Sequence, residues 1–156
     1  MSNNQSNDQL LGEVACSIAA TLDVIGDRWT LLILRDIFRG YWKFGELLDE
    51  GQMARNLLSN RLNALIAHGV LEKIPYQDRP VRYEYRLTKK GTDLSSALVA
   101  LMAWGDRWYA EHGPPTLLVH TKCDTPLHEV VRCSTCNETV GPGGIRSRPG
   151  PGRKPA

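Results

Sequence analysis

The sequence has no long apolar run and little net charge, and both absences narrow the classes of protein to which it can belong. No apolar stretch in the 156 residues approaches the roughly 20 residues that a membrane-spanning helix needs. The formal net charge is only +2 at pH 7, so any surface that binds a polyanion must be local. The first residues, MSNNQSNDQ, lack the charged-then-apolar pattern of a secretion signal, which predicts a cytoplasmic protein that does not contact membranes.

The sequence also lacks the residue patterns of common catalytic sites. It contains no recognisable pair of carboxylates for acid–base catalysis, no glycine-rich phosphate loop and no Ser/His/Asp set. Its histidines fall at predicted helix ends or in a cysteine-containing segment near the C-terminus: His68, His112, His120 and His128. We therefore do not expect an enzyme, and we assign no catalytic residue.

The most informative stretch is residues 44–69, which reads as a short helix, a glycine-containing turn and a longer helix. Apolar residues in the longer helix recur at helical spacing and form one buried stripe: Leu58, Leu62, Leu65 and Ile66. The opposite face carries Asn56, Ser59, Asn60 and Asn63 instead of the Lys and Glu of an ordinary solvated face. Asn and Ser hydrogen-bond to base edges, so this face suits a helix in the major groove of DNA. An ordinary amphipathic helix pair is the alternative.

Two helices are predicted before this pair. Residues 16–25 predict a short helix that ends at Gly26. Asp27 then offers an N-cap for the segment RWTLLILRDIF, which is apolar on nearly every side. We expect this second helix, which Gly40 ends, to be the centre of the core.

A basic hairpin is predicted directly after the helix pair. Tyr83, Tyr85 and Leu87 alternate with charged residues, which is typical of a half-buried strand. Residues 70–75 supply its partner strand and residues 77–80 the turn. Arg79 near the tip and Arg82 beside it can contact phosphates or enter a minor groove, although solvated surface is the alternative for both. Bases outnumber acids by 9 to 6 between residues 43 and 92, which weakly supports DNA contact.

Residues 88–112 predict one long helix, capped by Thr88. Its apolar side carries Leu94, Leu98, Leu101, Trp104 and Trp108. With two tryptophans, this side of the helix has more apolar surface than a small domain is expected to bury, which favours pairing with a second copy of the chain. Packing against its own core is the alternative. A twofold dimer would place two reading helices about one turn of DNA apart.

Taken in order, these pieces resemble an HxlR-type bacterial transcriptional regulator, a branch of the winged-helix proteins similar to the MarR group. The resemblance runs from about Cys16 to Trp108. Its motifs are LDVIGDRW at 22–29, KFGEL at 43–47, ARN at 54–56, SNRL at 59–62, HGVL at 68–71, RPVRYEYRLTKKG at 79–91 and WG at 104–105. The expected fold is mainly α with a small β-hairpin wing: a winged helix-turn-helix with a dimerisation helix and a small C-terminal Cys/His module.

The resemblance implies a homodimer, usually a repressor, that binds double-stranded DNA at an inverted-repeat operator. Residues 54–68 correspond to the helix that enters the major groove, and residues 77–81 correspond to the wing tip. The DNA contacts expected on this basis are Arg55, Asn56, Ser59, Asn60, Asn63, Arg79 and Arg82. The alternative is a winged-helix protein-interaction module that carries a structural zinc site and does not bind DNA specifically.

Family members that sense oxidants or electrophiles carry a cysteine before the first helix, and Cys16 matches that position. Ser17 follows it here, where the family commonly has proline. A helix N-terminus can stabilise a thiolate and so make it reactive. An oxidant or a small molecule is therefore the expected effector. The alternative role for Cys16 is that of a small apolar residue packed at a helix start.

The C-terminal segment contains a second set of potential ligands. His120, Cys123, Cys133 and Cys136 form H-x2-C and C-x2-C pairs separated by nine residues. Two such pairs can converge on one tetrahedral, structural Zn²⁺ per chain, although His128 competes with His120 for the fourth position. Asp124 and Asn137, which follow the pairs, tolerate positive φ next best after glycine. Three unligated thiols in a partly folded tail are the alternative.

This module resembles the small zinc-ribbon extension of some HxlR-type members. The complete expectation is a disordered N-terminus at 1–13, a winged helix-turn-helix DNA-binding and dimerisation domain at 14–112, a zinc-ribbon-like module at 113–140 and a flexible basic tail at 141–156.

Overall fold

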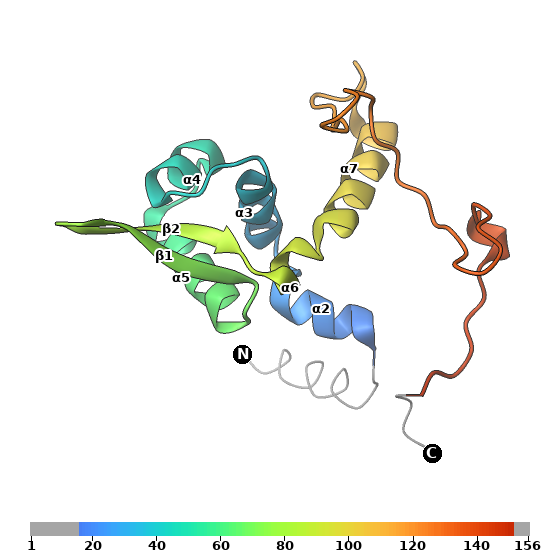
Figure 1. Cartoon of the computed structure of the whole chain (residues 1–156), viewed down its shortest axis with the longest axis horizontal. Helices are drawn as coiled ribbons and strands as arrows, with labels where there is room; N and C mark the ends of the chain where they lie inside the picture. Colours follow the sequence, from blue (N-terminus) through green and yellow to red (C-terminus); the bar gives the residue numbers. More distant parts are fainter. Residues whose placement is uncertain (1–15, 152–156) are drawn as a thin grey trace, which may run out of the picture. The chain divides into compact units, whose positions relative to one another are not determined.

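The computed structural model describes residues 16–151, which form two compact units, residues 16–94 and residues 95–151 (Figure 1). The predicted disorder of residues 1–13 lies outside the described residues, as do residues 152–156 of the predicted tail. None of the helices in residues 16–151 is both long and apolar enough to cross a membrane.

The first unit is a winged helix-turn-helix. Its elements in chain order are α2 (Ser17–Ile25), α3 (Arg28–Phe38), α4 (Phe44–Gly51), α5 (Arg55–Ala67), β1 (Leu71–Asp78), β2 (Val81–Leu87) and α6 (Lys89–Thr92). This is the mainly helical architecture with a two-stranded hairpin that the sequence predicts.

Helix α3 is the centre of the core, as predicted. Asp27 caps it, because Asp27 Oδ1 accepts hydrogen bonds from the amides of Trp29 and Thr30, both at 3.1 Å. The helix buries Ile33, Leu34 and Ile37 almost completely. The rest of the core comes from neighbouring elements: Ile25, Leu47, Met53, Leu58, Leu62, Leu65, Val70 and Leu71.

Helices α4 and α5 form the predicted helix pair. Gln52 has φ 45° and ends α4 in the left-handed region, so the chain turns at Gln52 and not at the adjacent Gly51. The buried stripe of α5 is confirmed at Leu58, Leu62 and Leu65, whereas Ile66 is half-buried. Gly69 follows the helix at φ +68°, a conformation that an L side chain would adopt only with strain.

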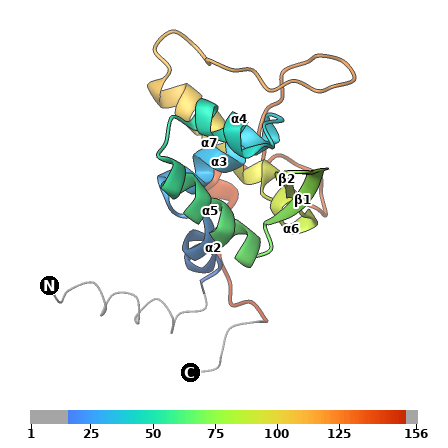
Figure 2. The same ribbon diagram turned by 90° about the vertical axis from the view of Figure 1, so that its left-hand side faces the viewer.

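Strands β1 and β2 form an antiparallel hairpin that projects away from α3, α4 and α5 (Figures 1 and 2). Asp78 pairs with Val81, so the turn is only Arg79–Pro80, narrower than the predicted residues 77–80. The predicted alternation of buried and exposed residues is wrong for the part of β2 near the turn, because Tyr83 is 37% exposed. A two-stranded sheet that extends beyond the helices has little to cover either face.

The predicted single helix over residues 88–112 is wrong. Thr88 does cap a helix, by accepting a hydrogen bond from the amide of Gly91, but α6 ends at Thr92. A second helix, α7 (Ser95–Tyr109), begins three residues later in the second unit. Asp93, Ser95 and Ser96 are weak helix formers whose side chains compete for backbone hydrogen bonds, which explains the break.

The second unit continues from α7 into two short turns and the 3-10 helix η1 (Pro142–Gly144). Isolated β-bridges close the two turns, Val119 with Pro126 and Arg132 with Thr139. We call residues 118–127 the first knuckle and residues 131–140 the second knuckle.

Candidate nucleic-acid interface

Helix α5 presents an uncharged polar face to solvent. The side chains of Asn56, Asn60 and Asn63 are exposed, and Ser59 on the same face is half-buried. Arg55 is also exposed, at the start of the helix. Because the buried stripe holds the other side of α5 against α3 and α4, this face offers both donors and acceptors to a partner in solution.

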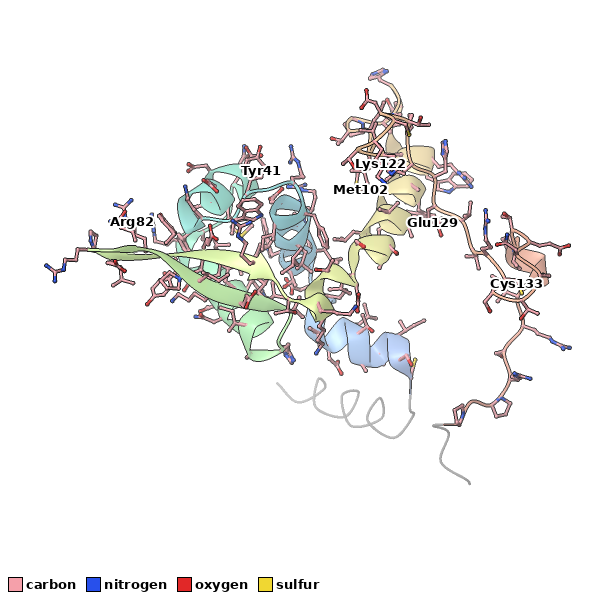
Figure 3. The ribbon with its side chains drawn as sticks, viewed as in Figure 1. Tyr41, Arg82, Met102, Lys122, Glu129 and Cys133 are labelled. Carbon is pink, nitrogen blue, oxygen red and sulfur yellow. The ribbon has the colours of Figure 1, made fainter. Side chains whose placement is uncertain are left out.

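The hairpin adds cations beside this helix. Arg79 lies at the turn and Arg82 extends from the outer part of the hairpin, and both are exposed (Figure 3). The five predicted contacts on α5 and the two on the hairpin thus all belong to the first unit, and all except the half-buried Ser59 are exposed.

An ion pair fixes α5 against the start of α3. Arg61 Nε lies 3.3 Å from Asp27 Oδ1. Partial burial alone would raise the pKa of the Asp27 carboxyl, but the hydroxyl and amide of Thr30, the charge of Arg61 and the amide of Trp29 together lower it. Asp27 therefore stays ionised at neutral pH and serves as both the helix cap and the partner of Arg61.

The other end of α5 is held by the helix that follows the hairpin. Lys90 Nζ donates a hydrogen bond to the carbonyl of His68 at 2.8 Å. His68 is the C-cap of α5, where a cation also complements the helix dipole. The sequence predicted neither Arg61 nor Lys90 as a positioning residue, because both act through partners at least 22 residues away.

The base of the hairpin is attached to the segment between α3 and α4. The amide of Tyr85 donates to the carbonyl of Trp42 at 2.8 Å, and the Arg86 guanidinium lies over the Trp42 ring at 3.2 Å from its centroid. Trp42 Nε1 in turn donates to the carbonyl of Ile37 at 3.2 Å. The hairpin is therefore anchored to the C-terminal end of α3 and not only to α5.

Three exposed cations of this unit each lie over an aromatic ring, and two of them, Lys43 and Lys73, are not among the predicted DNA contacts. Lys43 Nζ is 5.2 Å from the centroid of Tyr76, and Lys73 Nζ is 4.1 Å from that of Tyr83. The Arg55 guanidinium is 5.3 Å from the centroid of Phe44. In the sequence, Lys43 and Lys73 contribute only to the excess of bases between residues 43 and 92. The signal that identifies Lys73 is the strand register, which sets it opposite Tyr85, two residues from Tyr83 along the partner strand.

Glu46 organises the start of α4 next to these cations. Its Oε2 accepts hydrogen bonds from the amides of Trp42 and Lys43, both at 3.1 Å. The hydrogen bond from the Lys43 amide lowers the pKa of this carboxyl most, and desolvation opposes it. The Trp42 amide and the charge and side chain of Lys43 add to the lowering, so the pKa lies below its usual value. Glu46 is half-buried, and its Oε1 lies 3.7 Å from Lys43 Nζ.

Helix α7 carries the predicted dimerisation stripe. Leu101, Trp104 and Trp108 are 52%, 57% and 66% exposed, and Leu98 is half-buried. Leu94, the remaining predicted member, precedes the helix and is half-buried. Apolar surface of this size on one helix is unusual unless something covers it.

Cys16 is the exposed N-cap residue of α2. Its carbonyl accepts a hydrogen bond from the amide of Ala20 at 3.1 Å, so the thiol stands at the positive end of the helix.

The predicted metal ligands lie as two pairs, one on each knuckle. Within residues 16–151, no three His, Cys, Asp or Glu side chains lie close enough together to hold a metal ion. The positive φ predicted for Asp124 and Asn137 is confirmed, at 56° and 60°. The hydroxyl and amide of Thr125 lower the pKa of the Cys123 thiol, and the amides of Cys136 and Thr135 lower that of Cys133.

Comparison with known proteins gives a consistent result for this geometry. Residues 24–113 match the family described as HxlR-like helix-turn-helix. The uncharacterized HTH-type transcriptional regulator Rv3095 of Mycobacterium tuberculosis is 40% identical over 139 residues, which cover 88% of both chains. The crystal structure of the transcription-factor candidate PA1607 has a TM-score of 0.78 at 35% identity and covers 87% of this chain and 96% of its own.

A redox regulator is among the similar structures. HypR in its oxidized form has a TM-score of 0.55 at 28% identity, and the match covers 59% of this chain and 96% of the HypR chain.

Proposed function

This chain belongs to the HxlR-like helix-turn-helix family, whose members are transcriptional regulators and not enzymes, and from that premise we propose that it is a homodimeric, sequence-specific DNA-binding repressor. The observation that carries the proposal is the exposed polar face of α5 at Asn56, Asn60 and Asn63. An Asn side chain can donate a hydrogen bond to an adenine edge and accept one from it at the same time, so several Asn side chains on one helix face can distinguish bases. Lysines on the same face would mainly contact phosphates, which carry no sequence information.

The start of α5 supports a phosphate contact beside these base contacts. Its N-cap is Ala54, whose side chain offers no acceptor to the first amides of the helix. Those amides and the positive end of the helix dipole favour a phosphate oxygen, and Arg55 adds a full charge next to them. A phosphate that borders the major groove would therefore bind at the N-terminus of α5. The asparagines would then face the base edges in the groove.

The hairpin supplies sequence-independent contacts. Arg79 and Arg82 lie far from the anchored base of the hairpin, where Arg86 stacks on Trp42. A short hairpin that is fixed at one end and cationic at the other can lie along the phosphates that flank the groove. Lys43 and Lys73 extend the same positive surface toward the helix pair.

The exposed stripe of α7 supports dimerisation. Leu101, Trp104 and Trp108 form an apolar surface that a second copy of the same helix would cover under twofold symmetry. Two α5 helices related by a twofold axis read an inverted repeat, with half-sites about one helical turn apart.

Cys16 is the proposed site of regulation by oxidants or electrophiles. Support comes from its exposure at the N-terminus of α2 and from the similarity to the redox regulator HypR. Oxidation of this thiol would change the charge and size of a group at the end of a helix, which can shift the relative position of two subunits.

A binding experiment with the full chain tests the proposal. Fluorescence anisotropy is measured with a duplex from upstream of the protein's own gene and with a shuffled duplex of the same composition, over a series of salt concentrations. We expect at least a 100-fold preference for the natural duplex and a steep loss of affinity with salt. Equal affinity for both duplexes, or no binding at low salt, would support the protein-interaction module instead. A reporter fused to the same upstream region then gives the sign of regulation, with higher expression expected when the regulator is deleted.

A further inference from the structure

The net positive charge of the chain comes from its C-terminal end. We call residues 141–156 the tail, and it contains four bases and no acid: Arg146, Arg148, Arg153 and Lys154. The whole chain has 19 bases and 17 acids, so residues 1–140 have 15 bases against 17 acids and a net charge of −2. A concentration of bases at the end of an otherwise slightly acidic chain indicates where a polyanion binds.

The composition of the tail keeps it extended. Nine of its 16 residues are Gly or Pro, and Ile145 is its one large apolar residue, so it cannot bury a core of its own. After η1, Ile145 adopts extended backbone at φ −103° and ψ 126°, and residues 145–150 belong to no helix or strand (Figure 1). Pro149 also disfavours helical backbone at Arg148, the residue before it. The arginines of this segment are therefore presented on an extended chain.

The two arginines in the described part of the tail have no partner there. Arg146 and Arg148 are exposed, and within residues 16–151 neither forms an ion pair with a carboxylate or lies over an aromatic ring. Arg61 and Arg86, by contrast, pair with Asp27 and Glu84. A cation without an intramolecular partner can bind a polyanion without first breaking a contact.

The spacing of these arginines suits a DNA groove. Residues two apart in an extended chain are about 6–7 Å apart, which matches the rise of two successive phosphates along one strand. The residue between them, Ser147, is small and does not prevent close approach of the backbone. Arginines at this spacing on the terminal arms of homeodomains enter the minor groove while a helix reads the major groove.

We propose that the tail binds the minor groove of A·T-rich DNA, with Arg146 and Arg148 in the groove and Arg153 and Lys154 on phosphates. The inference rests on the proposed function, because it adds a second contact to a chain that binds DNA through α5. The narrow minor groove of A-tracts has an enhanced negative potential that attracts arginine. The guanidinium is also planar and weakly hydrated, so it loses less hydration than an ammonium on entering the groove.

This contact would differ from the one proposed for α5. The minor groove distinguishes A·T from G·C pairs but little else, so the tail would add a preference for base composition and not for a sequence. From Ile145 to the end of the chain, twelve residues can span at most about 40 Å, roughly one turn of DNA. The family match covers residues 24–113, so the tail lies outside the part of the chain that the family shares.

Binding of the full chain to two shuffled duplexes tests the proposal. The duplexes have equal length and no natural operator, and one is A·T-rich while the other is G·C-rich. We expect the wild type to prefer the A·T-rich duplex at least five-fold. The double variant Arg146→Gln with Arg148→Gln should prefer it less than two-fold, and its slope of log affinity against log salt should be lower by about two per bound chain. A double variant that keeps the wild-type preference would overturn the proposal.

Two matched variants separate groove binding from simple charge. Arg146→Lys with Arg148→Lys keeps the charge, so we expect it to keep the salt dependence and to lose the A·T preference. Lys122→Gln with Arg132→Gln removes two exposed cations from the knuckles and should keep the wild-type preference. A lysine variant with the full preference would mean that only charge is recognised. Loss of preference in the knuckle variant would remove the special role of the tail.

Competing ligands identify the groove and the class of nucleic acid. Netropsin, which occupies the minor groove of A·T-rich DNA, should weaken binding of the wild type to the A·T-rich duplex more than binding of the double glutamine variant. Equal weakening of both would contradict minor-groove binding by the tail. A single-stranded RNA of the same length provides the other comparison. If the glutamine substitutions weakened RNA binding more than binding to the A·T-rich duplex, RNA and not DNA would be the partner of the tail.

The same titrations keep this inference separable from the proposed function. The preference for the natural upstream duplex over a shuffled duplex of the same composition depends on α5, and the tail variants should leave it unchanged. Absence of that preference, with A·T preference still lost in the glutamine variant, would refute sequence-specific reading and leave the tail contact intact. A normal preference for the natural duplex, with no effect of the tail variants on A·T preference, would refute the tail contact alone.

Discussion

Arg61 on α5 reaches Asp27 at the start of α3, with Arg61 Nε 3.3 Å from Asp27 Oδ1. The same carboxylate caps α3 through the amides of Trp29 and Thr30 and accepts from the hydroxyl of Thr30. One side chain therefore sets both the start of the central helix and the position of the helix proposed to read DNA.

Removing the carboxylate should destabilise the first unit in two separable steps. Asp27→Ala loses the cap and the ion pair, and loss of a cap costs about 0.5–2 kcal/mol. Asp27→Asn keeps a capping oxygen for the two amides but loses the oxygen that accepts from the Thr30 hydroxyl and the ion pair with Arg61. The ion pair is partly exposed and should contribute less than about 1 kcal/mol, so Asp27→Asn should destabilise the unit less than Asp27→Ala. Urea unfolding of both variants measures the difference. Equal destabilisation by Ala and Asn would show that the cap contributes nothing.

The lowered pKa of Asp27 predicts how this contribution depends on pH. A carboxyl whose pKa is lower in the folded state than its unfolded value of about 3.9 stabilises the fold at higher pH. That stability is lost as the pH falls from about 4 through the folded pKa. Unfolding of the wild type and Asp27→Asn, compared at pH 7 and pH 3, should show the wild type's advantage shrinking at pH 3. An advantage that grows on acidification would contradict the direction of the pKa shift.

The stripe on α7 should control the oligomeric state. Trp104→Glu places a charge on the surface proposed to pair, and we expect the dimer to dissociate to monomers, with at least a ten-fold loss of affinity for an inverted-repeat duplex. Ala103→Glu is the control, because Ala103 is exposed on the same helix but lies about 160° around it from Leu101. Light scattering of both variants gives the masses. A dimeric Trp104→Glu, or a monomeric wild type, would refute the assignment.

Cys16 should determine the response to oxidants. We expect diamide or hypochlorite to weaken DNA binding by the wild type at least five-fold, and we expect Cys16→Ser to bind DNA equally with and without oxidant. Cys136→Ser serves as the matched control for thiol chemistry in the second unit. Oxidant sensitivity that persists in Cys16→Ser would assign the response to another thiol.

Much of the first unit could be predicted because its signals are local. The cap at Asp27, the buried stripe of Leu58, Leu62 and Leu65, and the polar face at Asn60 each depend on residues a few positions apart, and each is present in the structure. The positive φ of Asp124 was predictable for the same reason. Local spacing carries this information because helix and turn geometry is itself local.

The features that were missed depend on distance along the chain or on what covers a surface. Arg61 and Asp27 are 34 residues apart, as their numbers show, and no spacing rule joins them. The exposure of Tyr83 depends on how far the hairpin extends past the helices, which alternation in a strand does not encode. The break between α6 and α7 depends on weak preferences at Asp93 and Ser95, which an uninterrupted apolar stripe obscured.

The most direct test of the account is base preference measured for two single variants, Asn60→Ala on α5 and Arg79→Ala at the hairpin tip. Binding selection from a randomised duplex pool should show Asn60→Ala relaxing the preference at one position per half-site by about 1–3 kcal/mol. Arg79→Ala should weaken all sequences alike and lower the salt dependence by about one ion. Relaxed preference in Arg79→Ala with uniform weakening in Asn60→Ala would contradict the assignment of α5 as the reading helix.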